Sequence, residues 1–451
     1  MLLTGLIACT GPTTETGTQN ATLNNLSKEE MAAEVKEAFL HAWNGYKQYA
    51  WGHDALKPLS RSYHDWYAHS LLMTPVDAFD TMILMGLQKE ANEAKDLILD
   101  SLSFNYNMDV QVFEVTIRLL GGLIAAYQLD GEPRFLELAT DLANRLLPAF
   151  DTPTGMPFRY VNLITGMTRD SINNPAEIGT LTVEFGTLSK LTGNPVYYDK
   201  AKQAVTALFS RRSDIGLVGT TINVMTGEWI NQQSHISAMI DSYYEYHLKS
   251  AKLFNDKDFQ DMFDAGIQAV NKYLADTTYG GLWYGQANMY TGERTGTRFG
   301  ALDAFMPGLL VLSGDITRAK ALQENCFLMW TKHGIEPETI DYSNFEILWP
   351  SYVLRPENIE SATYLYHKTG DEKYLEMGKV MFQSILQHCK TDAGFAAIRD
   401  VRTMEKSDQI ESFFLAETLK YAYLLFAEIP GFNFNEKIFN TEAHLIGGYE
   451  L

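Results

Sequence analysis

The stretch Gly131–Phe150, GEPRFLELATDLANRLLPAF, opens with a break and continues as a helix. From Arg134 onward its apolar residues recur at the spacing that places them on one face of an α-helix. Similar breaks recur along the chain, each a Gly or Asn usually followed by an acidic or polar residue and then an aromatic. They stand at Gly131 (GEPRF), Gly193 (GNPVYY), Asn255 (NDKDF), Gly314 (GDITRA), Gly370 (GDEKYL) and Gly431 (GFNF).

Successive breaks lie 62, 62, 59, 56 and 61 residues apart, and an earlier break at Gly86 precedes Gly131 by 45. A period of this length fits two helices and a long loop, so each break is expected to end one helix and start another. A single helical pair cannot bury its own apolar face, and the pairs must therefore stack. The pattern predicts an all-α fold over residues 26–451 as one domain. Seven pairs would suffice to close a ring, although an open α-solenoid would show the same repeat.

A second repeat lies on the long loops. Thr165-Gly166, Thr226-Gly227 and Thr291-Gly292 each sit between β-prone stretches, RYVNLITGMT, TTINVMTGEW and QANMYTGERT. A turn pair between such stretches is typical of a β-hairpin. We therefore expect small β-hairpins on one face of the helical assembly.

The composition of the chain limits which classes of molecule it is expected to bind. The 451 residues are 46% hydrophobic, which is enough for a large core, and the formal net charge is −20. A strongly acidic chain is a poor partner for nucleic acid or an anionic membrane surface. A neutral ligand such as a sugar, or a bound cation, suits it better, although simple solubility would explain the same charge.

The amino-terminal residues 1–25 read as a leader. Leu6-Ile7-Ala8-Cys9 resembles a bacterial lipobox, in which the cysteine is lipidated and becomes the mature N-terminus, and a Thr/Gly/Asn-rich linker follows. We therefore expect export to the bacterial periplasm or outer membrane as a lipoprotein, with a lipid anchor on Cys9. The alternative is a poorly ordered tail with an incidental cysteine.

Several acidic residues stand inside apolar helices, where charge needs a partner or a task. Glu114 and Arg118 lie four apart in VFEVTIRLLGGLI, Asp241 lies among aromatics, and Glu357 begins a predicted helix just after a proline. Glu360, Glu411 and Glu417 repeat the pattern. In a ring the inner helices converge, so these side chains would gather at one centre. Paired carboxyls can protonate a leaving oxygen and activate water, as hydrolysis of a glycosidic bond requires.

The same residues carry a family resemblance. Seven motifs occur in family order between about Ala42 and His444, and by them the sequence resembles the class I α-1,2-mannosidases, glycoside hydrolase family 47. The motifs are YAWGHDALKPLS (Tyr49 to Ser60), VDAFDTMILMGL (Val76 to Leu87), FEVTIRLLGGLIAAY (Phe113 to Tyr127), DSYYEYHLK (Asp241 to Lys249), LRPENIES (Leu354 to Ser361), ESFFLAETLKY (Glu411 to Tyr421) and NTEAH (Asn440 to His444). With Cys9, the resemblance suggests a bacterial member of the family.

The resemblance implies an (α/α)7 barrel that removes terminal α-1,2-linked mannose from mannose-rich oligosaccharides, with inversion and with Ca²⁺. It implies Glu114 as general acid, acting through a water, with Asp241 as the competing acid, and Glu357 as general base. It implies Thr441 as the only direct protein ligand of the calcium ion, through its carbonyl and hydroxyl oxygens. The implied substrate-binding or supporting residues are Arg118, Arg355, Glu360, Phe413, Glu417 and Glu442. We expect a monomer.

The sequence departs from the family pattern at several positions. Met239 replaces an arginine that helps select the sugar branch in some members, and Ala301 replaces a histidine. Ala304 replaces one cysteine of the family disulfide, so Cys326 is expected to be a free thiol. Leu445 replaces the proline after NTEAH. None of these changes removes a catalytic carboxylate.

Three other functions are open from the residues. A relative could keep the barrel and bind mannose-rich glycans without hydrolysing them. Another (α/α)-barrel sugar enzyme, such as a glucosidase or an epimerase, would use different chemistry. A purely structural helical scaffold would leave the carboxylates in apolar helices without a reason.

Overall fold

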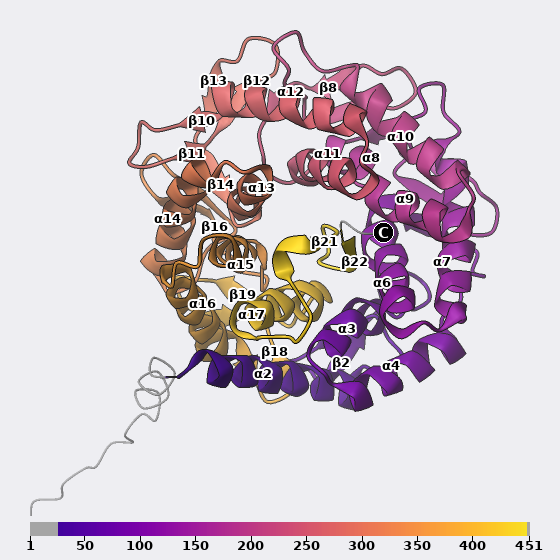
Figure 1. Cartoon of the computed structure of the whole chain (residues 1–451), viewed down its shortest axis with the longest axis vertical. Coiled ribbons are helices and arrows are strands. Elements are labelled where there is room, and N and C mark those ends of the chain that lie inside the picture. The colour runs from indigo at the N-terminus through magenta and orange to yellow at the C-terminus, as the bar shows by residue number, and fades with distance from the viewer. Residues whose placement is uncertain (1–25, 449–451) are drawn as a thin grey trace, which may run out of the picture.

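The computed structural model describes residues 26–448, which form a closed ring of two helical layers (Figure 1). Outer and inner helices alternate along the chain. The outer helices are α2 (Lys28–Tyr49), α4 (Gln88–Ser101), α7 (Pro133–Leu146), α10 (Val196–Phe209), α12 (Lys257–Tyr273), α14 (Ile316–His333) and α16 (Lys373–Cys389). The inner helices are α3 (Met73–Leu84), α6 (Gly121–Asp130), α9 (Thr182–Thr192), α11 (Asp241–Phe254), α13 (Met306–Ser313), α15 (Glu357–Thr369) and α17 (Leu419–Phe426).

Shorter turns extend four of the inner helices at their N-terminal ends. They are α5 (Val112–Val115) with the π-helical turn η1 (Thr116–Leu120) before α6, α8 (Pro175–Gly179) before α9, the 3₁₀ turn η3 (Leu302–Phe305) before α13, and the π-helical turn η4 (Phe414–Thr418) before α17. A second 3₁₀ turn, η2 (Leu147–Phe150), follows α7. The ring closes where α17 packs against α2 and η4 packs against α3. An (α/α)7 barrel is therefore confirmed, and the open solenoid is excluded.

The apolar spacing of the sequence produces the core between the two layers. In α7 the buried residues are Phe135, Ala139, Leu142, Ala143 and Leu146, which form one stripe at helical spacing. Phe135 packs on Phe79 of the inner helix α3, with ring centroids 5.2 Å apart. The stretch Val112–Asp130 is long and apolar enough to cross a membrane, but 72% of its most apolar 18-residue segment is buried inside the ring. It is a core helix.

The predicted breaks are the links from inner to outer helices. Gly131, Gly193, Gly314 and Gly370 follow the last residues of α6, α9, α13 and α15, and all four adopt the left-handed conformation that glycine tolerates best. Asn255 does the same after α11. At Gly431 the prediction of another helix is wrong. All seven outer positions are already filled, and the chain turns back through the 3₁₀ turn η5 (Phe434–Glu436) into the ring.

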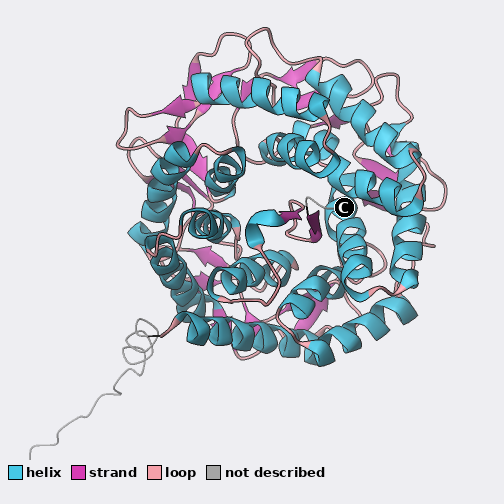
Figure 2. Cartoon of the chain, in the orientation of Figure 1, coloured by secondary structure: helices cyan, strands magenta, loops and turns pink. Residues whose placement is uncertain are grey.

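Small sheets cover one face, on the loops that lead from outer to inner helices (Figure 2). The three predicted hairpins are confirmed as the antiparallel pairs β4–β5, β7–β8 and β12–β13. The three-stranded sheets are β3-β4-β5 (Asp109–Gln111, Tyr160–Asn162, Thr168–Arg169), β6-β7-β8 (Ile172–Asn173, Thr221–Asn223, Trp229–Asn231), β9-β12-β13 (Gln233–Ser234, Gln286–Asn288, Arg294–Gly296) and β14-β15-β16 (Arg298–Gly300, Thr339–Asp341, Glu346–Trp349). The two-stranded sheets are β1-β2 (Ala55–Lys57, Ser62–His64), β10-β11 (Ala275–Asp276, Trp283–Tyr284), β17-β18 (Lys390–Thr391, Gly394–Phe395) and β19-β20 (Ile398–Asp400, Glu405–Lys406).

The last hairpin has a different place. Strands β21 (Lys437–Phe439) and β22 (Leu445–Gly448) pair antiparallel, and this C-terminal hairpin lies at the centre of the ring (Figure 1). Its turn is the NTEAH motif, residues 440–444. The hairpin therefore brings the end of the chain to the point where the inner helices converge. The predictions for residues 1–25, including the lipobox at Cys9, lie outside the described residues.

Candidate active site

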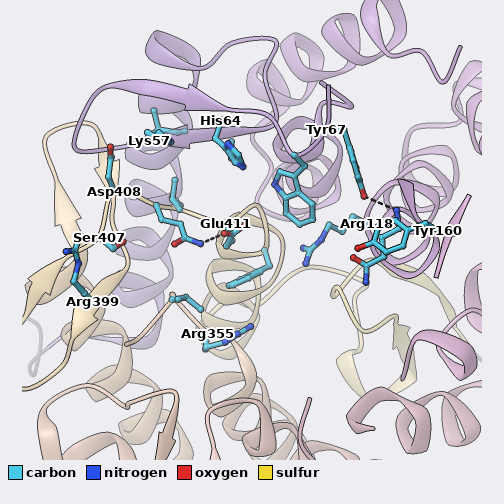
Figure 3. Close-up of a pocket in the computed structure, with 18 residues that line it drawn as sticks. Lys57, His64, Tyr67, Arg118, Tyr160, Arg355, Arg399, Ser407, Asp408 and Glu411 are labelled. Atoms are coloured by element: carbon cyan, nitrogen blue, oxygen red, sulfur yellow. Dashed lines mark hydrogen bonds between the residues drawn. The ribbon is translucent and has the colours of Figure 1, made fainter. Parts of the chain in front are cut away.

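A cavity opens on the β-hairpin face and narrows toward the C-terminal hairpin. Its outer part, here called the vestibule, has a volume of about 840 Å³. Figure 3 shows Tyr67 and Arg118 on one side of it and Lys57, Asp408 and Arg399 on the other. An inner pocket of about 250 Å³ shares three of its lining residues with the vestibule, namely Arg118, Arg355 and Phe413.

The inner pocket holds the predicted catalytic carboxylates. Glu114, Asp241 and Glu357 all line it, together with Glu417, Thr441 and Glu442. A further recess of about 50 Å³ adds Glu360 and Glu245 beside Asp241, Glu357 and Thr441. The structure thus brings together every residue that the sequence placed in the site, from segments more than 300 residues apart.

Two of the carboxylates begin inner helices. Asp241 is the first residue of α11 and Glu357 the first of α15. Just before each helix a non-glycine residue adopts a left-handed conformation, Met239 with φ 78° and Leu354 with φ 68°. Such residues cost energy and persist where their surroundings hold them. The hydroxyl of Thr418 donates to the carbonyl of Leu354 at 2.6 Å and fixes the second of these turns.

Burial dominates the protonation of these groups. It raises the pKa of Asp241 to about 7, against the hydrogen bond from the Ser242 backbone N–H, which lowers it. It likewise raises the pKa of Glu357 to about 7, although the charge of Arg355 opposes the shift. The helix N-terminus at Glu357 and the charge of Arg355 favour the ionised form, but burial has the larger effect on this pKa. The assignment of Glu357 as the base stays a prediction.

Arg118 is the central cation of the pocket. Its Nε donates to Glu114 Oε2 at 2.9 Å, its Nη1 donates to Glu442, and Nη1 lies 3.6 Å from Oδ2 of Asp77. Its guanidinium also stacks 5.8 Å from the ring centre of Phe413. Glu114 and Arg118 therefore form an ion pair that lines the inner pocket, which explains why two charged residues stand in an apolar helix.

Arg355 is held from outside the catalytic motif. Glu338 accepts from both Nε and Nη2 of Arg355, at 3.1 to 3.2 Å. The Arg355 guanidinium lies 5.5 Å from the Phe413 ring, so this ring stacks with both arginines of the pocket. Two residues before Glu338, the buried Glu336 accepts from the side chain of Asn358 at 2.8 Å. The segment Glu336–Glu338 thus holds the residues on either side of Glu357.

The remaining carboxyl groups of the pocket are crowded together, and burial dominates their protonation. Burial raises the pKa of Glu360 to about 8, with Lys249 opposing the shift. Burial also raises the pKa values of Glu417 and Glu442 well above their usual range. The charge of Glu442 raises the pKa of Glu417 further. At Glu442 the charge of Arg118 opposes the rise in pKa, while the charges of Asp77 and Glu114 add to it. A bound cation would relieve this repulsion.

The donor set around Thr441 suits a hard cation such as Ca²⁺, which binds oxygen ligands. Thr441 lines both the inner pocket and the recess, and neither its carbonyl nor its hydroxyl oxygen accepts a hydrogen bond from another described residue. Within residues 26–448 no group of three or more His, Cys, Asp or Glu side chains forms a metal site by itself. A cation here would take Thr441 and waters held by acids such as Glu417.

Sequence reasoning missed the residues that fix the NTEAH turn. Asp80 accepts from Lys420 at 2.8 and 2.9 Å, and Lys420 also donates to the carbonyl of Ala443. Asp77 pairs with His444 at 3.2 Å. The signal was available, since Asp77 and Asp80 are charges inside the apolar stretch VDAFDTMIL, as Glu114 is inside its own helix.

The departures from the family pattern have clear places. Met239 is 39% exposed and lines the inner pocket. Ala301 and Ala304 are buried. Cys326 and Cys389 are both free and buried, in agreement with the expected loss of the disulfide.

A closed ring of seven helical pairs, with its carboxylates at the N-terminal ends of the inner helices, defines an (α/α)7-barrel glycoside hydrolase. Residues 38–447 match the model of glycosyl hydrolase family 47, and the chain belongs to this family. It is 38% identical to Alpha-mannosidase I MNS5 of Arabidopsis thaliana, over 93% of this chain and 78% of that protein.

Two further relatives carry more specific names. The chain is 36% identical to human mannosyl-oligosaccharide 1,2-alpha-mannosidase IB, over 92% of this chain and 69% of that protein. The solved alpha-1,2-mannosidase from Trichoderma reesei superposes with a TM-score of 0.85 at 30% identity, covering 92% of this chain and 98% of that one. Family membership removes the epimerase and scaffold alternatives.

Proposed function

We propose that this chain removes terminal α-1,2-linked mannose residues from mannose-rich oligosaccharides, with inversion and with Ca²⁺ bound at Thr441. The observation that carries the proposal is the shape of the cavity. A vestibule of about 840 Å³ narrows to a pocket of about 250 Å³ that ends at the C-terminal hairpin. A pocket of that size suits one terminal sugar, with the rest of the glycan in the vestibule. The names of the two mannosidase relatives supply the linkage.

The carboxylates divide the reaction between them. Glu357 in its ionised form takes a proton from a water whose oxygen attacks the anomeric carbon. The bond from that carbon to the leaving oxygen breaks, and this oxygen receives a proton from the acid, Glu114 or Asp241. Inversion requires a water between base and sugar, so the two carboxyls must stand on opposite sides of the ring. A calcium ion, when bound, would bind sugar hydroxyls and orient the ring.

The choice of acid now has a physical basis. A general acid works best when its pKa is close to the working pH. Burial raises the pKa of Asp241 to about 7. We favour Asp241 on this ground. Glu114 would then orient a water or the leaving sugar through its pair with Arg118.

The decisive experiment is a digest of mannobioses of defined linkage, with and without EDTA. We expect mannose from the α-1,2 isomer, loss of turnover in EDTA and recovery with Ca²⁺. Full activity in excess EDTA would remove the calcium role. Binding of mannose-rich glycans with no release of free mannose would instead favour the non-hydrolysing alternative.

We also propose export as a lipoprotein, with the lipid on Cys9. The support is the sequence LIAC at residues 6–9. The relatives described above come from eukaryotes, so the bacterial origin is supported by this stretch alone. Metabolic labelling with a fatty acid should mark the chain but not a Cys9→Ser variant.

Gel filtration of that variant should show the expected monomer.

A further inference from the structure

The side chain of Asn440, at the start of the NTEAH turn, uses its full hydrogen-bonding capacity. Its Nδ2 donates to the carbonyl of Ile117 and to Oε1 of Glu184, both at 2.8 Å. Its Oδ1 accepts from the backbone N–H groups of Glu442 at 3.0 Å and His444 at 2.8 Å. An amide can make no more than these four bonds. One buried side chain therefore shapes the turn from inside and ties it to η1 and α9.

A second chain of hydrogen bonds reaches Thr441 itself. The Thr441 backbone N–H donates to Oη of Tyr246 at 3.2 Å, and Oη of Tyr246 lies 2.5 Å from Oε1 of Glu184. A backbone N–H can only donate. The Tyr246 hydroxyl therefore accepts from Thr441, and its one O–H donates to Glu184. The direction of the chain is thus fixed, from Thr441 through Tyr246 to Glu184.

Glu184 is where both chains end. It is completely buried in α9, and its Oε2 has no hydrogen-bond partner among the described residues. Oε1 accepts from Tyr246 of α11 and from Asn440 of the C-terminal hairpin. The catalytic chemistry derived above does not use this carboxyl. It holds two neighbouring helices and the hairpin turn at one point.

We propose that Glu184, Tyr246 and Asn440 are positioning residues that hold Thr441 with its carbonyl and hydroxyl oxygens free to bind the cation. The inference rests on the calcium site proposed above. The backbone N–H groups of the turn donate to the buried side chains of Asn440 and Tyr246. The carbonyl and hydroxyl oxygens of Thr441 accept from no donor among the described residues. Hydrogen-bond partners behind a metal ligand typically change metal affinity by about 10- to 100-fold when removed.

The structure offers a matched pair of variants for the test. Tyr246→Phe removes only the hydroxyl between Thr441 and Glu184. Tyr243→Phe removes a hydroxyl from the same helix α11, also buried, but one that has no hydrogen-bond partner in residues 26–448. Calcium is first removed from the full-length proteins with EDTA and dialysis. Isothermal titration with CaCl₂ then gives the Kd, and thermal melts without calcium report stability separately.

We expect Tyr246→Phe to weaken calcium binding by about 10- to 100-fold, and Tyr243→Phe to leave the Kd within about twofold of wild type. Glu184→Gln keeps the shape of the side chain but replaces a carboxyl that can ionise by a neutral amide, so an intermediate loss is expected. This variant also serves if Tyr246→Phe does not fold.

The outcomes separate the two proposals. If the wild-type protein binds no calcium, the calcium site fails and this inference fails with it. If wild type binds calcium while Tyr246→Phe and Glu184→Gln bind it equally well, the positioning role is overturned and the calcium site stands. Lower stability of the calcium-free variants with an unchanged Kd also overturns the positioning role, because a purely structural role would produce that result.

Discussion

Arg118 and Glu114 are joined by a hydrogen bond of 2.9 Å from Nε to Oε2, one helical turn apart on the wall of the inner pocket. Asp241, in the same pocket, accepts hydrogen bonds from its neighbour Ser242 and has no ion pair within the described part of the chain. The two candidate acids therefore lie in different electrostatic surroundings. Burial raises the pKa of Asp241 to about 7, which suits a group that must donate a proton.

Asp241→Asn should lower kcat on α-1,2-mannobiose by about 10²- to 10⁴-fold, the usual contribution of a general acid. It should lose much less on α-mannosyl fluoride, because fluoride leaves without needing a proton. Steady-state kinetics on both substrates makes the comparison, with Glu114→Gln measured alongside. Rescue by the fluoride in Glu114→Gln but not in Asp241→Asn would give the acid role to Glu114.

The ring itself could be predicted from the sequence because its determinants are local. Gly131 and Gly370 end inner helices through their own backbone conformation. The buried stripe of α7 follows from the spacing of its apolar residues in the sequence. The acids of the site were found for a similar reason. A charge such as Glu114 stands out against its own apolar neighbours, whatever lies across the ring.

The partners of those charges could not be predicted, because they lie far away in sequence. Asp77 and His444 are 367 residues apart, and Lys420 and Asp80 are 340 apart. No spacing rule connects such positions. The pKa of Glu357 escaped prediction for the same reason: the helix start before it is local, while the burial that outweighs it comes from the whole ring.

Without calcium, the melting temperature should fall as the pH rises from about 5 to about 8. Burial raises the pKa values of Asp241, Asp303, Glu184 and Glu357 to about 7, from ordinary values near 4. Between these values the folded state holds more protons than the unfolded state, so raising the pH favours unfolding. The pKa of His444 is also raised by its two aspartates, and its stabilising charge is likewise lost as the pH rises.

Thermal melts in EDTA across this pH range provide the measurement, and Asp241→Asn with Glu357→Gln should flatten the slope. Added calcium should flatten it too, by favouring the ionised carboxylates. A melting temperature that rises steadily toward pH 8 in EDTA would show that these carboxyls are ionised at little cost in the folded state.

Cys326 and Cys389 should both be unreactive in the native protein and reactive after denaturation. Both are fully buried, and burial raises the pKa of each thiol, so little thiolate is present. Titration of unreduced Cys9→Ser protein with a thiol reagent should find two thiols in guanidinium and almost none without it. A non-reducing digest that links the two cysteines would contradict this.

Glu357→Gln should lower kcat by at least about 10²-fold while KM changes little, because the variant keeps the shape of the pocket and loses only the base. Glu357 begins α15 with its Oε2 buried and without a hydrogen-bond partner among the described residues, which leaves that oxygen free to take a proton. The flanking residues Arg355 and Asn358 are held by Glu338 and Glu336, so the amide should sit where the carboxylate did. Glu346→Gln, on the exposed strand β16, is the matched control and should keep wild-type kinetics. Because the wild-type base must be ionised and burial raises its pKa to about 7, kcat/KM should rise with pH up to about that value.

NMR of the first product from wild type should show β-mannose, as inversion requires. Initial α-mannose, or a near-normal kcat in Glu357→Gln, would show that this carboxyl is not the base of an inverting reaction.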